Sequence, residues 1–185
     1  GEFMRINKYI AACGVCSRRK AEEYILSGRV RINDMVVSIL SADVKENDEV
    51  FLDEKKIELE NKYVYLMPNK PRGYVTTNNE QFGRKCTLDL IKENVRVYPI
   101  GRLDMDTEGL LLFTNDGEFV YKVTHPKHEI EKTYTVTIKG IIKKEEVKNL
   151  EIGVDIGEYI TKPAKVKILK IDKLGKCVKQ LVIVF

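Results

Sequence analysis

The chain has 185 residues, enough for one large domain or two small ones, and its 43% hydrophobic content excludes a disordered polypeptide. No apolar run approaches the ~20 residues of a membrane helix, and no apolar signal-peptide segment is present, so we expect a cytoplasmic protein. The net charge of +4 says little by itself, and Gly1, Glu2 and Phe3 before Met4 are interpreted as a cloning scar.

Charge is distributed unevenly within the first 60 residues. Residues 5–31 contain seven basic and two acidic side chains, and residues 34–60 contain nine acidic and three basic ones. A basic face beside an acidic one suits docking on a polyanion in one orientation. The alternative is two solvated surfaces that differ only by chance.

Two helices are predicted at the N-terminus. Ile6 and Ile10 share a face at i, i+4 spacing, which favours a helix over residues 5–13. Ser17 is a suitable N-cap for a second helix that ends near Gly28. The first turn of that helix holds three cations, Arg18, Arg19 and Lys20. Because a helix N-terminus favours acids, these cations are a local conflict that hints at function.

Short strands follow, and together with the helices they predict a compact αα-plus-β-hairpin module. They are expected at residues 29–32, 35–39 and 50–52, with a turn at Asn33-Asp34. The polar stretch 58–62 is the expected linker. We therefore place one domain at residues 4–61 and a second at 62–185.

The second domain is predicted to be α+β with a mostly antiparallel sheet. Residues 133–138 alternate strictly between apolar and Thr side chains, which is typical of a half-buried strand. Further strands are expected at 63–67, 74–77, 110–113, 164–171 and 178–185, and short helices at 87–92, 118–124 and 143–150.

The most informative segment is the polar loop from Gly101 to Gly109, which precedes an apolar strand. It offers Arg102, Asp104, Asp106, Thr107 and Glu108. A carboxylate on a loop that a rigid sheet supports can act as a nucleophile or a general base. The alternative is a tight turn whose acids only face water.

Residues 101–117, GRLDMDTEGLLLFTNDG, resemble the signature of the RsuA/RluB/RluE/RluF family of ribosomal RNA pseudouridine synthases. Asn69-Lys-Pro-Arg-Gly73 resembles the family's Lys-Pro-x-Gly loop, and Glu131-Lys-Thr-Tyr134 resembles its Lys-x-Tyr strand. Residues 4–60, with Arg5-Ile-Asn-Lys-Tyr-Ile and Ser17-Arg-Arg, resemble the S-four-like RNA-binding domain that precedes the catalytic domain. The resemblance covers essentially the whole chain after Met4.

The resemblance implies a bacterial enzyme of ribosome biogenesis that isomerises uridine without a cofactor or metal. Asp104 would be the catalytic aspartate, which attacks or deprotonates the target sugar while the glycosidic bond breaks. Tyr134 would stack on the target base, and Arg102 would hold the base out of its helix or fill its place. From its strand position alone, Tyr134 is instead a core tyrosine beside Val136 and Ile138.

Basic side chains from both domains are predicted to contact RNA phosphates. In the second domain these are Lys70, Arg72, Arg84 and Lys85. In the N-terminal module they are Arg5, Lys8, Arg18, Arg19, Lys20, Arg29 and Arg31. Such contacts make RNA affinity fall steeply with salt.

The chain departs from the family pattern at its C-terminus. The family continues with a basic segment that pairs with the catalytic aspartate, whereas this sequence stops at Phe185. Its last five residues form an apolar strand, for which we expect an exposed, adhesive edge. We therefore expect a truncated form or fragment whose own activity is in doubt.

Several alternatives remain open on the sequence alone. Residues 82–90 and His125-Pro126 favour the branch of the family that acts on large-subunit rRNA, with small-subunit rRNA as the rival. A non-catalytic RNA-binding or ribosome-assembly protein is the second hypothesis. The expected partner is rRNA or a subunit assembly intermediate, bound by a monomer with no role for a membrane.

Cys13-Gly-Val-Cys16 has the spacing of half a zinc site, but small buried residues explain it as well.

Overall fold

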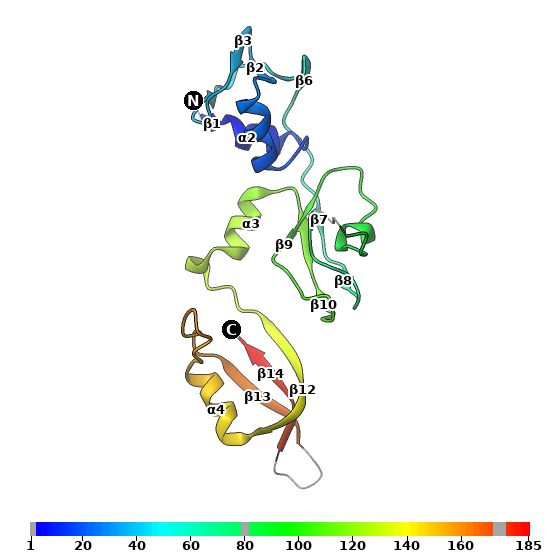
Figure 1. Ribbon diagram of the computed structural model, residues 1–185, viewed down its shortest axis with the longest axis vertical. Helices are drawn as coiled ribbons and strands as arrows, with labels where there is room; N and C mark the ends of the chain where they lie inside the picture. Colours follow the sequence, from blue (N-terminus) through cyan, green and yellow to red (C-terminus); the bar gives the residue numbers. More distant parts are fainter. Residues whose placement is uncertain (1–2, 79–81, 172–176) are drawn as a thin grey trace. The chain divides into compact units, whose positions relative to one another are not determined.

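The computed structural model describes residues 3–78, 82–171 and 177–185, so Gly1 and Glu2 of the interpreted cloning scar lie outside it. The chain divides into two compact units, Gly1–His125 and Pro126–Phe185 (Figure 1). Helices and antiparallel sheets occur in both units, as an α+β protein requires. The domain boundary expected between residues 61 and 62 stays a prediction.

The N-terminal part of the first unit is a helix pair packed on a small sheet. Its elements are β1 (Met4–Arg5), α1 (Ile6–Ala12), α2 (Arg18–Leu26), β2 (Val30–Ile32), β3 (Met35–Val37), β4 (Asp43–Val44), β5 (Val50–Leu52) and β6 (Lys55–Ile57). The sheet has the antiparallel order β3-β2-β5-β6, and β1 pairs with β4. Both predicted helices are confirmed, and Ser17 caps α2 by accepting a hydrogen bond from the Lys20 amide at 3.2 Å.

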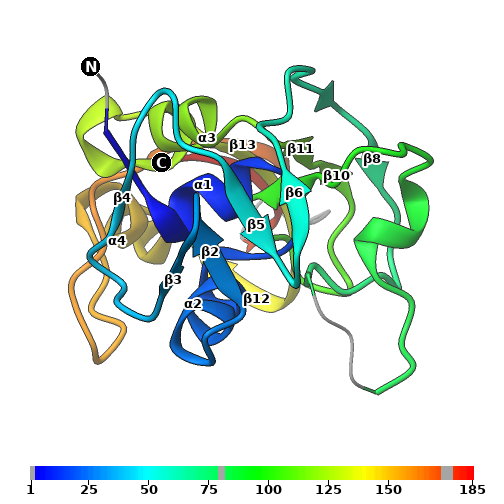
Figure 2. The ribbon, with the colours of Figure 1, turned by 90° about the horizontal axis from the view of Figure 1, so that it is seen from above.

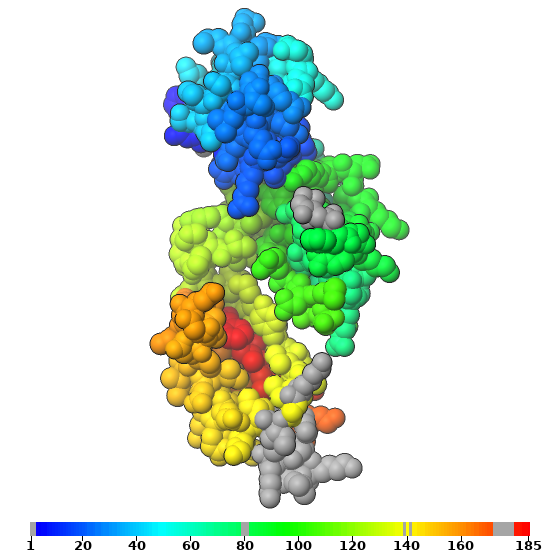
Figure 3. Space-filling view, in the orientation of Figure 1, coloured from blue at the N-terminus to red at the C-terminus, as the bar shows by residue number. Residues whose placement is uncertain are grey.

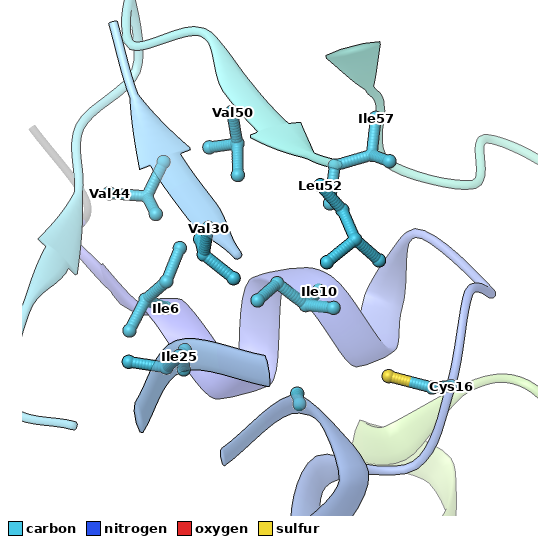
Figure 4. Close-up of a cluster of buried hydrophobic side chains, with 10 residues drawn as sticks. Ile6, Ile10, Cys16, Ile25, Val30, Val44, Val50, Leu52 and Ile57 are labelled. Atoms are coloured by element: carbon cyan, nitrogen blue, oxygen red, sulfur yellow. The ribbon is translucent and has the colours of Figure 1, made fainter. Parts of the chain in front are cut away.

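One apolar cluster joins these helices to the sheet (Figure 4). Ile6 and Ile10 of α1 and Ile25 of α2 are fully buried against Val30 and Val50. The i, i+4 spacing of the two α1 isoleucines explains this packing, because it places both on one helix face. The helix pair is thereby fixed to the sheet, which holds the first turn of α2 at the surface.

The remainder of the first unit is built from short strands around a second apolar cluster. Its elements are β7 (Tyr65–Leu66), β8 (Asn69–Lys70), η1 (Thr87–Leu90), β9 (Tyr98–Ile100), β10 (Gly109–Leu110), β11 (Leu112–Thr114), α3 (Gly117–Thr124) and, beyond the unit boundary, η2 (Pro126–His128). β11 lies between β7 and β9, and β8 pairs with β10. Val64, Val97, Leu111 and Phe113 form the core here.

One expectation for this region is wrong, and one strand was not predicted. Residues 74–77 do not form a strand, because only Val75 makes a single bridge, to Cys86, and Thr76 bonds to a neighbouring loop. Residues 98–100, for which no strand was predicted, form β9 although they contain Pro99. Pro99 is tolerated because β9 is an edge strand of its sheet and one backbone donor is dispensable there.

The second unit is a three-stranded sheet with one helix. It comprises β12 (Thr133–Lys143), α4 (Lys144–Ile152), β13 (Lys165–Ile171) and β14 (Cys177–Val184), and the strand order is β12-β14-β13. Val147 of α4 packs with Leu181 and Ile183 of β14. Figure 2 shows the ribbon of α4 from a second direction. The predicted alternation over residues 133–138 is confirmed by alternating exposed and half-buried side chains.

The expectation of an exposed C-terminal edge is wrong. β14 is the central strand and pairs with β12 on one side and β13 on the other. Phe185 continues this pairing, because its backbone exchanges two hydrogen bonds of 3.1 Å with Lys132. In Figure 3 the red terminal strand is flanked by yellow and orange residues of the same unit. Both ladders are thus satisfied within the chain.

Candidate functional site

The loop between β9 and β10 presents polar side chains to solvent. Gly101 opens the loop with a φ of 78°, a conformation that favours glycine. Arg102 and Asp104 are both exposed, whereas Leu103 between them packs into the cluster of Phe113 and Leu111. The inward leucine turns its two neighbours outward, so the arginine and the carboxylate share one exposed loop.

Lys70 supports the backbone of this loop with hydrogen bonds. Its side chain is fully buried, and its Nζ donates hydrogen bonds to the carbonyl oxygens of Asp104 at 2.9 Å and Thr107 at 2.7 Å. The carbonyls of Met105 at 3.3 Å and Pro71 at 3.1 Å complete the set. Four carbonyl oxygens around one buried ammonium satisfy its donors and fix the loop's backbone.

The surroundings of Lys70 also shift its pKa. Burial lowers the pKa of Lys70 below its ordinary value, while the carboxylates of Asp106 and Asp104 act in the opposite direction. The lysine is therefore a desolvated cation whose charged form the carboxylates of Asp106 and Asp104 favour.

Three further contacts tie the loop to the segment that follows Lys70. The Gly73 amide donates to the Met105 carbonyl at 2.8 Å. The Thr76 hydroxyl donates to the Leu103 carbonyl at 2.8 Å and accepts from the Leu103 amide at 3.2 Å. Sequence reasoning did not single out Thr76, because an isolated threonine after a turn carries no distinctive signal.

The structure contradicts one predicted RNA contact. Lys70 is fully buried with its ammonium bonded to backbone carbonyls, so it has no surface from which to reach a phosphate. Arg72 is exposed as expected, and its guanidinium lies 3.9 Å from the carboxylate of Glu108. The Lys-Pro pair in the motif therefore marks a support for the loop.

The end of the 101–117 motif also has a structural explanation. Asn115 accepts a hydrogen bond from the Val64 amide and donates one to the Lys62 carbonyl, both at 2.8 Å. Asp116 caps α3 by accepting from two backbone amides, and it also accepts the Tyr65 hydroxyl at 2.6 Å. That hydrogen bond raises the pKa of Tyr65 to about 12. These residues anchor β7 and α3 around the site.

Tyr134 lies in the second unit, at the end of β12 where it pairs with Ile183. Its ring is half-buried and meets that of Phe185 edge-on, with centroids 6.1 Å apart. Its cross-strand partner Ile183 belongs to the apolar cluster that includes Val147 and Leu181. Arg102 and Asp104 are brought together on one loop, whereas Tyr134 belongs to the other unit.

Several predicted RNA-binding cations of the N-terminal module are paired with acids. Arg5 forms an ion pair with Asp43 at 3.3 Å. Arg29 donates to both carboxylate oxygens of Asp53 and stacks on Tyr24, with 4.2 Å between its Cζ and the ring centroid. The uneven charge of the sequence is therefore partly neutralised in space, because acids of residues 34–60 meet cations of residues 5–31.

Arg31 is similarly engaged. Its guanidinium lies 3.1 Å from a carboxylate oxygen of Glu54 and 4.0 Å from the ring centroid of Phe51. Lys20 forms an ion pair with Glu23 one helical turn along. Lys8, Arg18 and Arg19 are exposed, and within the described part of the chain their side chains make no hydrogen bond or ion pair. Among the described residues of the N-terminal module, the predicted RNA-binding cations without an acidic partner are therefore Lys8 in α1 and Arg18 and Arg19 at the start of α2.

The cysteine pair provides no evidence of a metal site. Cys16 is buried in the N-terminal cluster and Cys13 packs against it. Burial raises the pKa of the Cys13 thiol to about 12, which disfavours the thiolate that a metal needs. Among the described residues, no group of three or more His, Cys, Asp or Glu side chains is placed to bind a metal ion.

No helix of residues 3–78, 82–171 and 177–185 has the length and apolarity to cross a membrane.

Comparisons with known proteins bear on both parts of the chain. Residues 64–180 match the RNA pseudouridylate synthase family, and residues 4–50 match the S4 domain family. Ribosomal large subunit pseudouridine synthase B of Bacillus subtilis (strain 168) is 48% identical over 171 residues, which cover 91% of this chain and 69% of that protein.

Two further similarities agree. The dual-specificity RNA pseudouridine synthase RluF of Escherichia coli (strain K12) is 39% identical, covering 89% of this chain and 57% of that protein. A crystal structure of a pseudouridylate synthase superposes with a TM-score of 0.62 at 28% identity, covering 98% of this chain and 76% of that one. The chain thus spans 57% to 69% of the length of these two curated relatives. With an S4 domain preceding its synthase domain, the chain belongs to the RNA pseudouridylate synthase family.

Proposed function

We propose that this protein isomerises a uridine in ribosomal RNA to pseudouridine, with Asp104 as the essential carboxylate. The observation that carries this proposal is the exposed Asp104 on a loop whose backbone is bonded to the buried ammonium of Lys70. A catalytic group must be held in one geometry while it stays accessible to substrate, and this loop meets both requirements.

The reaction requires one carboxylate and no external reactant. The bond between the uracil N1 and the sugar breaks, uracil rotates, and its C5 bonds to the same sugar carbon. The hydrogen on C5 leaves as a proton, while N1 gains one, so the atoms balance. The side chain of Asp104 either attacks the sugar or removes a proton from it as the first bond breaks.

Arg102 and Tyr134 are proposed to stabilise the target base outside its helix. A base inside a helix cannot be reached by a catalytic group, so it must leave its stack. The planar guanidinium of Arg102, exposed on the same loop as Asp104, suits the vacated place or the base's outer edge. The half-buried ring of Tyr134 suits stacking on uracil.

The N-terminal module is proposed to dock on rRNA or a subunit assembly intermediate in the bacterial cytoplasm. Lys8, Arg18 and Arg19 are the strongest candidates for phosphate contacts, because their charges are not balanced by acids within the described residues. Arg5, Arg29 and Arg31 would first have to exchange an acidic partner for a phosphate. We propose that the protein acts as a monomer.

Large-subunit rRNA is the proposed target. The 48%-identical relative from Bacillus subtilis carries a large-subunit name, and residues 82–90 resemble the same branch. Small-subunit rRNA is the competing target. Pseudouridine mapping distinguishes the two targets, because it assigns each pseudouridine to one nucleotide of one rRNA.

Pseudouridine mapping in cells tests the proposal. The maps compare rRNA from cells with the wild-type gene, the Asp104→Asn variant and the Asp106→Asn variant. Asp106 is the matched control, since it is an exposed carboxylate of the same loop. Loss of one large-subunit site with Asp104→Asn alone supports the proposal. An unchanged map with an assembly defect would instead support a non-catalytic RNA-binding protein.

A further inference from the structure

Phe82 and Arg84 form an exposed aromatic–cation pair, and hydrogen bonds of neighbouring residues connect it to the Asp104 loop. The Phe82 side chain is 78% exposed, and the Cζ atom of Arg84 lies 5.1 Å from its ring centroid. The adjacent Lys85 places its ammonium 5.9 Å from the ring centroid of Tyr74. Two rings and two cations thus occur within a short stretch of surface.

Backbone hydrogen bonds connect the residues that follow this pair to the loop that carries Asp104. The Val75 amide donates to the Lys85 carbonyl at 2.9 Å, and the Thr87 amide donates to the Val75 carbonyl at 3.0 Å. Gly73 and Thr76, on either side of Val75, bond to Met105 and Leu103 of the loop. One segment, residues 73–76, therefore lies between the loop that carries Asp104 and the residues that follow Phe82.

The chemistry of the pair fits an unpaired nucleotide. A large apolar ring in water has an unfavourable hydration free energy, which a stacked base relieves. Every nucleobase offers a flat face to such a ring, and a guanidinium beside it can add stacking and a phosphate contact. A target base that leaves its helix leaves unstacked neighbours, and these need a surface near the catalytic carboxylate.

We propose that Phe82 and Arg84 form a stacking platform for an unpaired nucleotide that flanks the target uridine. The proposal rests on the proposed function for its substrate, an rRNA with a locally single-stranded target region. It assigns these two residues to RNA binding near the site and leaves the chemical step to Asp104.

Binding of a fluorescent RNA tests the platform. The probe is a 12-nucleotide single-stranded oligouridylate with one central 2-aminopurine, whose fluorescence falls when the base stacks. Phe82→Leu is expected to weaken binding about 10-fold and to remove the quenching, because one base–aromatic contact is lost. Phe82→Tyr is expected to keep both. Tyr159→Leu is the matched control, since Tyr159 is a 61% exposed aromatic residue of the other unit.

The outcomes separate the platform from a folding role and from the proposed function. Equal weakening by Phe82→Leu and Phe82→Tyr, or wild-type affinity and quenching in Phe82→Leu, would overturn the platform. If Asp104→Asn still abolishes pseudouridine in that case, the proposed function survives. A protein that makes no pseudouridine but loses RNA affinity with Phe82→Leu would retain Phe82 as an RNA-stacking residue, and would lose both the proposed function and the assignment of the stacked nucleotide as a neighbour of the target.

Discussion

At the scale of single residues, Lys70 determines the shape of the site without facing the substrate. A buried ammonium is stable only when its donors are satisfied, and the carbonyls of Asp104 and Thr107 are its closest partners. The same bonds orient the loop so that Leu103 points inward and Asp104 outward. Stability of the fold and accessibility of the carboxylate are therefore coupled at one side chain.

Replacing Lys70 tests that coupling. Lys70→Met keeps the volume but removes the ammonium donor that four carbonyls share, so the free energy of unfolding is expected to fall by about 3 kcal/mol. Arg72→Met, at the exposed neighbour, is expected to change it by less than about 0.5 kcal/mol. Urea unfolding of both variants measures the difference, and equal stabilities would show that the carbonyl contacts contribute nothing.

Tyr65 provides a test that depends on pH. Its pKa is raised from 10.0 to about 12, first by the hydrogen bond to Asp116. A group with a raised folded-state pKa contributes stability that is complete below pH 10 and is lost as the pH rises through 12. Asp116→Asn is expected to lower the pKa of Tyr65. Difference titration at the phenolate absorbance, with Tyr65→Phe as reference, measures this, and an unchanged pKa would refute the assignment.

At the scale of elements, the first turn of α2 combines a good cap with unfavourable charges. Ser17 satisfies the Lys20 amide, while Arg18 and Arg19 add positive charge where the helix dipole is already positive. Such an arrangement is costly for the free protein and favourable once phosphates approach.

Salt dependence of RNA affinity tests the role of α2. The double variant Arg18→Gln/Arg19→Gln is expected to reduce the slope of log affinity against log salt by about 1 to 2, since each lost phosphate contact removes nearly one released counterion. Arg29→Gln is expected to change the slope less, because Asp53 already neutralises Arg29. Equal slopes for the double variant and the wild type would exclude α2 from the RNA interface.

The elements that sequence predicted are those with strong local signals. Ser17, Gly28 and Asn115-Asp-Gly117 mark helix ends and a turn, and the alternation of residues 133–138 marks a strand. β6 was missed because its hairpin turns at Asp53 and Glu54, whose φ values of 49° and 62° are those usually taken by Asn or Gly. Tertiary pairing with β5 overrides that local preference.

At the scale of the whole molecule, the proposed catalytic residues come from both units. Arg102 and Asp104 lie in Gly1–His125, and Tyr134 lies in Pro126–Phe185. Sequence identified these residues through a motif, since a loop carboxylate and a strand tyrosine look ordinary by themselves. It could not place Lys70, because a lysine in a polar loop is usually exposed and only the tertiary structure shows the carbonyls around it.

The most direct measurement of the central claim is hydrogen release from C5 of uridine. Large-subunit rRNA labelled with tritium at C5 of uridine is incubated with the purified protein, because bonding of C5 to the sugar expels that hydrogen. We predict stoichiometric release at one site by the wild type and by Asp106→Asn, and none by Asp104→Asn. Release by Asp104→Asn at the wild-type rate would contradict the assignment of that carboxylate to catalysis.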